Sequence, residues 1–306
     1  LDAYRGLIMF TLLCGGIFQS LKDHPFWHAL ATQNEHVRWE GCVYWDLIQP
    51  SFMFMVGVAM PFAFARRAAQ GDPWSRQLRH AVLRAFNLLL LGILLDHFGA
   101  SKIQIGFIRV LQQIAIGYLL AFFVLGKSLR TQGLTAALLL VGYQMLWMFN
   151  PWNGPGGPWA MGNENLGSAF DFQLLGRHYS GYYVGLNAIP ATATILFGVM
   201  AGQLILRTTD PVRTCRLLLA AGLAGVGLGL ALSPWFPIIK RIWTPSFAIY
   251  AGGWTTLMLA FFFWIIEMRG LRRWDARGTR RVDHLIAPGA IGHENIWAGL
   301  APLTHD

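Results

Sequence analysis

A histidine and an aspartate ten residues apart are the side chains of this sequence best suited to chemistry. His36 lies in a polar stretch, and Asp46 lies three residues into an apolar run that begins at residue 43. A carboxylate that accepts a hydrogen bond from one imidazole N–H fixes the tautomer and leaves the other ring nitrogen free as a base or nucleophile. We therefore take His36 and Asp46 as the candidate catalytic pair.

Asp46 also has a purely structural interpretation. It stands where an apolar helix is expected to begin, and a carboxylate there caps free N–H groups and interacts favourably with the helix dipole. His36 and the glycines Gly41 and Gly57 crowd the same stretch. That crowding favours a site over a cap alone, although both interpretations remain open.

The composition indicates that membrane-spanning helices position this pair. Apolar residues make up 55% of the 306 residues, whereas 13% are charged, which is roughly half the share in globular proteins. The apolar residues gather in long runs, and Leu88–Leu91 does not alternate in polarity as a barrel strand would. We therefore predict an all-α, polytopic membrane bundle and exclude a disordered chain.

Eight apolar segments fit such spans. A helix needs about 20 residues to cross a bilayer core of about 30 Å, and several segments are shorter, of which the third and fifth fit least well. The segments cover about 5–21, 43–65, 80–96, 107–126, 133–149, 186–206, 215–236 and 246–266.

The cations sort unequally between the two sides that eight spans would create. The net charge is +9, and 17 of the 24 Lys and Arg fall on the side that carries both termini. The positive-inside rule places that side in the cytoplasm and the 22–42 loop, with His36, outside. Because the cations lie in short segments between apolar runs, we expect no nucleic-acid partner.

The basic segment 66–84 has two interpretations. Its arginines could hold the phosphates of a nucleotide-like cofactor, whereas orientation and contact with anionic lipid explain them equally well. The candidate cofactor-binding residues are Arg66, Arg67, Arg76 and Arg79. We expect no metal, because His24 and His28 lack a third ligand and the three cysteines are widely spaced.

Several stretches of the sequence resemble the heparan-alpha-glucosaminide N-acetyltransferase-like membrane proteins, which include many bacterial members. The resemblance runs in order over about residues 1–274. It rests on His36–Gly57, Leu1–Gly6, Val110–Ala115, Asn187–Ala191 and Trp243–Phe247.

This resemblance implies an acetyltransferase of the bacterial cytoplasmic membrane. It would move an acetyl group from cytosolic acetyl-CoA, as co-substrate, to the amino group of a glucosamine-type sugar or glycan on the outward face. His36 matches the family's active-site histidine, and Asp46 matches its partner carboxylate. The residues that we expect to bind substrate are Trp39, Gly41, Gln112 and Asn187.

The C-terminal part departs from the family. Relatives continue with further spans after the position of Trp274, whereas residues 275–306 are polar and contain no apolar run of about 18 residues. We therefore expect a membrane domain over 1–274 and a tail over 275–306, which a frameshift, a truncation or divergence would each produce.

Two other functions fit the same features. A transporter for a sugar or small acid would also place Asn and Gln inside a glycine-rich bundle, although no inverted repeat is apparent. A homologue without catalytic activity would keep only the fold. The sequence leaves open whether the chain forms a homo-oligomer.

Overall fold

The structure is a computed structural model that describes residues 1–19, 22–97 and 105–271. Within these ranges every regular element is a helix, which confirms the predicted all-α class. The predicted tail over 275–306 and its boundary at 274 lie outside the described residues.

Each predicted apolar segment overlaps a helix. In chain order the helices are α1 (Asp2–Gln19), α2 (His28–Gln33), η1 (Tyr44–Leu47), α3 (Ile48–Ala69), α4 (Trp74–His97), α5 (Val110–Phe122), α6 (Leu129–Met148), α7 (Leu166–Leu175), η2 (Ser180–Tyr182), η3 (Gly185–Asn187), α8 (Ala188–Arg207), α9 (Pro211–Leu232), α10 (Pro245–Phe263) and η4 (Trp264–Met268). Of these, α2 and α7 lie between the predicted segments. Among the described residues, five helical stretches are long and apolar enough to cross a membrane. They contain α3, α4, α8, α9 and α10. The chain is thus an integral membrane protein, and the count of eight spans stays a prediction.

Local sequence explains where several helices begin. The Asp210 side chain accepts a hydrogen bond from Val212 N at 2.9 Å, and Pro211 occupies the first turn of α9. Thr244 accepts from Phe247 N ahead of Pro245 in the same way, at the start of α10. Such caps satisfy N–H groups that a helix start leaves free, and proline suits the first turn because it has no N–H to lose.

The closest backbone approach near the site lies between α3 and α8. A Cβ atom at Gly57 would overlap the carbonyl oxygen of Ile195, and one at Gly198 would overlap that of Phe54. Glycine at both positions therefore lets the helices meet backbone to backbone. This contact sets Asp46, just before α3, relative to Asn187, just before α8.

We expect Gly198→Ala to lower the free energy of unfolding by about 1–3 kcal/mol, because the added methyl group meets backbone that cannot rotate away. Gly142→Ala on α6 is the matched control, since a Cβ there meets no heavy atom within 4 Å. Thermal unfolding of the purified chain in detergent measures both. Equal melting temperatures for the two variants would contradict this packing.

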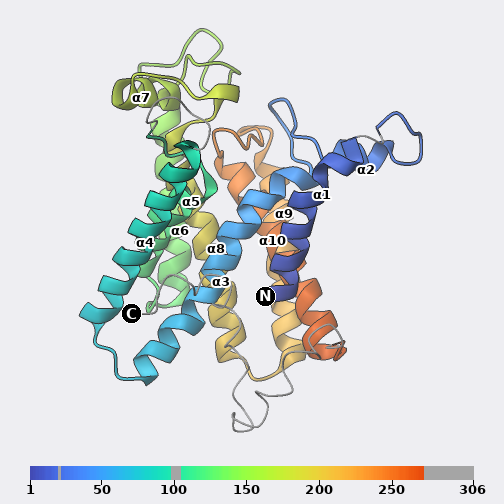
Figure 1. The fold of residues 1–306 in the computed structure, drawn as a ribbon, viewed down its shortest axis with the longest axis vertical. Coiled ribbons are helices and arrows are strands. Elements are labelled where there is room, and N and C mark those ends of the chain that lie inside the picture. The colour runs from blue at the N-terminus through green and yellow to red at the C-terminus, as the bar shows by residue number, and fades with distance from the viewer. Residues whose placement is uncertain (20–21, 98–104, 272–306) are drawn as a thin grey trace.

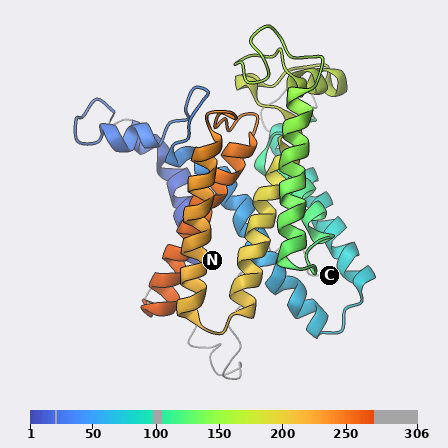
Figure 2. The same cartoon turned by 180° about the vertical axis from the view of Figure 1, so that it is seen from behind.

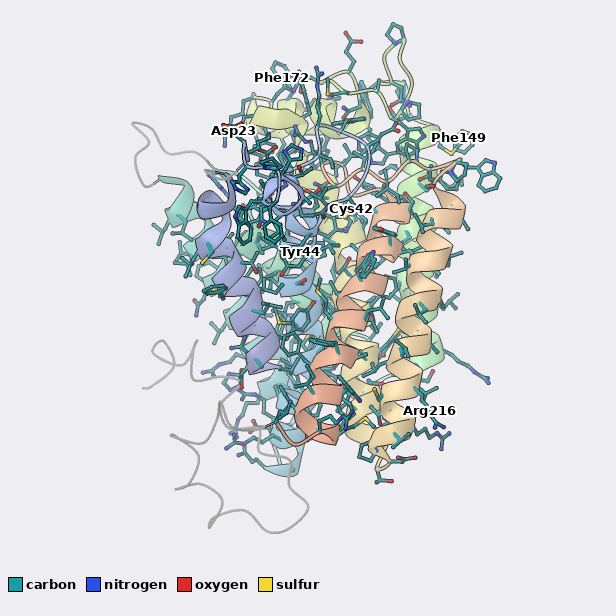
Figure 3. The ribbon with its side chains drawn as sticks, turned by 90° about the vertical axis from the view of Figure 1, so that its right-hand side faces the viewer. Asp23, Cys42, Tyr44, Phe149, Phe172 and Arg216 are labelled. Atoms are coloured by element: carbon teal, nitrogen blue, oxygen red, sulfur yellow. The ribbon has the colours of Figure 1, made fainter. Side chains whose placement is uncertain are left out.

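The two ends of the bundle carry different connecting segments (Figures 1 and 2). One end carries α2, α7 and the segments 22–43 and 150–187, and we call it the loop end. The other carries the α3–α4 and α8–α9 connections, and we call it the basic end. Figure 3 shows Tyr44 and Phe172 at the loop end and Arg216 at the basic end. The segments 22–43 and 150–187 therefore lie at the same end of the bundle.

Candidate active site

The structure brings His36 and Asp46 into direct contact at the loop end. His36 Nδ1 lies 2.6 Å from Asp46 Oδ1. The Asp46 side chain is 1% exposed, whereas that of His36 is 41% exposed. Because a carboxylate only accepts, Nδ1 carries the proton of this bond and Nε2 keeps a free lone pair. An accessible base is thus held in one tautomer by a buried acid.

Asp46 also caps the short helix η1 that leads into α3. Its second oxygen, Oδ2, accepts a hydrogen bond from Val43 N at 3.3 Å, and Asp46 N donates to Val43 O at 3.0 Å. Asp46 therefore caps the helix start and contacts His36 at the same time, and its catalytic role stays a prediction. The cap fixes the carboxylate on the helix start, and the fixed carboxylate orients the imidazole.

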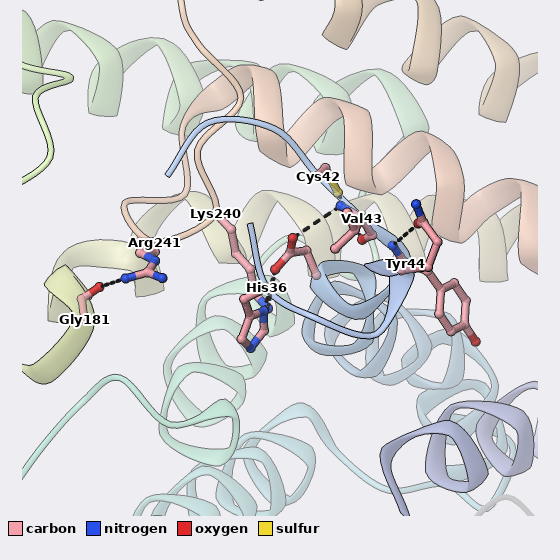
Figure 4. A network of polar contacts seen from close by, with 9 residues as sticks. His36, Cys42, Val43, Tyr44, Gly181, Lys240 and Arg241 are labelled. Atoms are coloured by element: carbon pink, nitrogen blue, oxygen red, sulfur yellow. Dashed lines mark hydrogen bonds and ion pairs between the residues drawn. The ribbon is translucent and has the colours of Figure 1, made fainter. Parts of the chain in front are cut away.

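Lys240 completes the group, although no motif in the sequence marks it as a site residue. Its Nζ lies 3.3 Å from Asp46 Oδ1 and 3.4 Å from His36 Nδ1, and its side chain is 6% exposed (Figure 4). Burial lowers the pKa of the Lys240 ammonium, and the adjacent Asp46 carboxylate opposes that shift. The buried carboxylate therefore has both a counter-charge and a histidine to orient.

The segment before α10 holds Lys240 in place. Thr244 Oγ1 accepts from Ile239 N at 3.0 Å and donates to Pro237 O at 2.8 Å. Trp243 is fully buried and has φ +50°, a left-handed conformation that a bulky residue adopts only when its surroundings impose it. The turn that carries Lys240 is therefore held by hydrogen bonds to Thr244 and by the burial of Trp243.

Cys42 lies close to the same carboxylate but is not suited to nucleophilic catalysis. Burial raises the pKa of its thiol to about 12, and the negative charge of Asp46 adds to that shift. The thiol therefore stays protonated near neutral pH, and the thiolate is the nucleophilic form. His36 is the better candidate for the reacting group.

Trp39 and Gly41 shape the loop that carries His36. Trp39 Nε1 donates to Trp159 O at 2.7 Å, which ties this loop to the 150–165 segment. Gly41 has φ +109°, a conformation that favours glycine, and its N–H donates to Ile238 O at 2.8 Å. Both residues lie beside the site, and their substrate contacts stay a prediction.

The structure separates the other two predicted substrate residues. Asn187 Nδ2 donates to Arg241 O at 2.6 Å, next to Lys240, and its buried Oδ1 has no hydrogen-bond partner. Gln112 is buried at the start of α5, where its Oε1 accepts from Arg109 N at 3.0 Å. Asn187 thus adjoins the Lys240 turn, whereas Gln112 serves a helix start.

The predicted cofactor-binding arginines lie at the basic end. Asp72 pairs with Arg76 at 2.8 Å and lies 3.6 Å from Arg67. Arg66 and Arg67 stand about 20 residues beyond Asp46, which corresponds to about 30 Å of helix at 1.5 Å per residue. Phosphates held by these arginines would therefore lie far from His36, and this role stays a prediction.

A second buried carboxylate ties α7 to the start of α8. Asp171 is 1% exposed, its Oδ2 accepts from Gly185 N at 2.8 Å, and its Oδ1 has no hydrogen-bond partner. Burial raises the pKa of Asp171 to about 6. The ordinary value in an unfolded chain is about 3.9. Between these two pH values the folded chain binds this proton more tightly than the unfolded chain does.

We therefore expect Asp171 to make the fold less stable as pH rises from about 4 to about 6. Asp171→Asn keeps an acceptor for Gly185 N and removes the titration. The difference in melting temperature, wild type minus variant, should become smaller as pH is raised from 4 to 7. A difference that is the same at both pH values would contradict this assignment.

The fold is a bundle of membrane helices, and its loop end holds an exposed histidine against a buried carboxylate. These are the groups that acid–base chemistry in a membrane protein requires. The family model described as heparan-alpha-glucosaminide N-acetyltransferase, catalytic, matches residues 1–228, and the chain belongs to that family. Membership indicates a membrane acetyltransferase that acts on glucosamine-type substrates. No curated protein matches the chain significantly. The match confirms the resemblance and includes His36 and Asp46 but ends before Lys240.

No group of three His, Cys, Asp or Glu side chains that could hold a metal ion occurs in the part of the chain that the structure describes. His36 Nδ1 donates to Asp46, and the Lys240 ammonium lies beside that bond and contacts the same carboxylate oxygen.

Proposed function

We propose that this protein transfers the acetyl group of acetyl-CoA to the amino group of a glucosamine-type sugar at the loop end. The observation that carries the proposal is the 2.6 Å contact between His36 Nδ1 and the buried Asp46. That contact leaves Nε2 of an exposed imidazole free to take a proton, which is the task of a general base.

His36 would serve as base and then as acid. The neutral amine nitrogen attacks the thioester carbonyl carbon, and its proton passes to His36 Nε2 as the C–N bond forms. The C–S bond then breaks, and the imidazolium gives that proton to the departing thiolate. The products are the N-acetyl sugar and free CoA thiol. Alternatively, Nε2 attacks the thioester carbonyl first, the C–S bond breaks and CoA leaves as the thiolate, so that Nε2 holds the acetyl group. The amine then attacks that carbonyl, the bond to Nε2 breaks, and the amine proton passes by way of Nε2 to the thiolate.

Lys240 would adjust how strongly Asp46 stabilises the imidazolium. A buried carboxylate without a counter-charge would hold the proton on His36 and oppose its transfer to the thiolate. Because Lys240 lies 3.3 Å from the same oxygen, it offsets most of that charge. The histidine can then both accept and release a proton within one cycle.

The orientation in the membrane is part of the proposal. The cation bias supports a cytoplasmic basic end in a bacterial cytoplasmic membrane, with His36 on the outward face. Acetyl-CoA would approach from the basic end, where Arg66, Arg67, Arg76 and Arg79 offer positive charge for its phosphates. The thioester would then reach His36 through the interior of the bundle.

Reconstituted vesicles separate this function from transport. Labelled glucosamine is supplied outside and acetyl-CoA inside or outside, and both sugar uptake and N-acetyl product are measured. The proposal expects N-acetyl product and no accumulation of unmodified sugar. Uptake without product would instead identify a transporter.

Cysteine labelling tests the orientation separately. Asp23 is exposed at the loop end and Arg216 at the basic end. In a background where the three native cysteines are replaced, an impermeant maleimide added to intact cells should label Asp23→Cys and spare Arg216→Cys. The reverse pattern would overturn the orientation without affecting the chemistry.

A further inference from the structure

An apolar groove lies between two pairs of helices in the membrane part of the bundle. α6 packs on α8 and α9 packs on α10, whereas α8 and α9 make few contacts with each other. The groove between the pairs has a volume of about 450 Å³. Small side chains keep it open, among them Gly133 and Ala137 on α6 and Ala221 and Ala224 on α9.

The lining of the groove is apolar apart from Thr256. Its α6 wall runs from Leu129 to Leu140, which is about 16 Å at 1.5 Å per residue. An apolar groove of this length suits the acyl chain of a lipid, and the charges at its end indicate the kind of headgroup.

A positively charged hollow continues the groove at the basic end. It has a volume of about 320 Å³ and shares Leu204 with the groove. Arg207 and Arg213 line it, and neither has an ion-pair or hydrogen-bond partner among the residues that the structure describes. Asp210, which also lines it, accepts the capping hydrogen bond from Val212 N. The hollow therefore carries a net charge of +1 and suits one phosphate group.

We propose that the groove and the hollow together bind an anionic diacyl phospholipid from the leaflet at the basic end. One acyl chain lies along the groove, and the headgroup phosphate lies between Arg207 and Arg213. Basic pockets between membrane helices bind anionic headgroups. Arg207 and Arg213 are both exposed and can reach such a headgroup at the membrane surface. The site is remote from His36 and independent of the proposed acetyl transfer.

Native mass spectrometry of the full chain in detergent tests this site, with phosphatidylglycerol and phosphatidylcholine of the same acyl composition as probes. We expect tighter binding of phosphatidylglycerol. At about fivefold per cation, Arg207→Gln with Arg213→Gln should weaken it about 25-fold. The control Arg216→Gln removes a cation from the same helix end but outside the hollow, and should leave binding unchanged. Equal affinity for the two lipids, or an unaffected double variant, would overturn the proposal.

The acyl chain is tested by filling the groove. Ala224→Leu should weaken phosphatidylglycerol binding, whereas Ala220→Leu, on the same helix but outside the groove lining, should not. Glycerol 3-phosphate at the same concentration should not displace the lipid. Displacement would show that the hollow binds a free phosphate. A change of oligomeric mass in Ala224→Leu at constant lipid binding would show that a second copy covers the groove.

Discussion

Replacing His36 by alanine is expected to lower the rate of acetyl transfer about 10²–10⁴-fold, which is the usual contribution of a positioned general base. The variant loses Nε2, the one site atom that is both accessible and free to take a proton. Asp46 remains paired with Lys240 at 3.3 Å, so the buried charge stays compensated. The loss should therefore appear in the rate, with little change in the melting temperature.

The matched control is His178→Ala. His178 is also exposed and lies at the loop end, but it stacks on Phe172 and is not part of the Asp46 group. Its substitution should leave the transfer rate within about twofold, since surface changes away from a site have small effects. Full activity in His36→Ala would remove the histidine from the mechanism. An equal loss in both variants would point to a disturbed loop end.

The second large effect concerns the buried ion pair between Asp46 and Lys240, which lies next to His36. Lys240→Met leaves the Asp46 carboxylate without its cation, and Asp46→Asn leaves the Lys240 ammonium without its anion. Breaking a buried pair from one side costs about 3–5 kcal/mol, because an uncompensated charge remains. The double variant removes both charges, so it should be more stable than either single variant.

The exposed pair between Lys22 and Glu35 provides the comparison. Their atoms are 2.7 Å apart, but both side chains are substantially exposed. Lys22→Met should therefore change the free energy of unfolding by no more than about 1 kcal/mol. Additive losses in the Asp46 and Lys240 double variant, measured by unfolding in detergent, would show that the two charges do not compensate each other.

The contact between His36 and Asp46 could be predicted because it is local. Ten residues separate them, and a loop that leads into a helix start stays near it. Lys240 is 204 residues from His36, and its position depends on how α3, α8 and α10 pack. Its neighbours Ile239 and Ile242 are apolar in the sequence and fully buried in the structure. Their apolar character was the feature of the sequence that could have indicated a buried lysine. In the count of cations on the two sides of the membrane, Lys240 is one of the outward cations, and that count gives it no role in the site.

Helix boundaries were predicted less well than helix existence. α4 begins at Trp74 instead of near residue 80, because its first turns are polar and still helical. α9 covers Pro211–Leu232 instead of about 215–236, although Asp210 followed by Pro211 is a recognisable start signal. Hydropathy indicates which residues lie in an apolar environment. A helix, however, ends where its backbone hydrogen bonds end, and that point can lie outside the apolar stretch.

Gln112 shows a further limit of the sequence. A glutamine inside an apolar run is compatible with a substrate contact, a contact between helices or a helix cap. In the structure its side chain accepts a hydrogen bond from Arg109 N at the start of α5. Only the packed bundle distinguishes these roles, because each places the same residue type at the same spacing.

The most direct test of the account is product formation by the purified wild-type chain. The folded protein is incubated with labelled acetyl-CoA and glucosamine, and the N-acetyl sugar and free CoA thiol are quantified by mass spectrometry. The account predicts that both appear in equal amounts, at a rate proportional to protein concentration and dependent on His36. Release of CoA thiol without N-acetyl sugar, or no turnover by a chain shown to be folded, would contradict it.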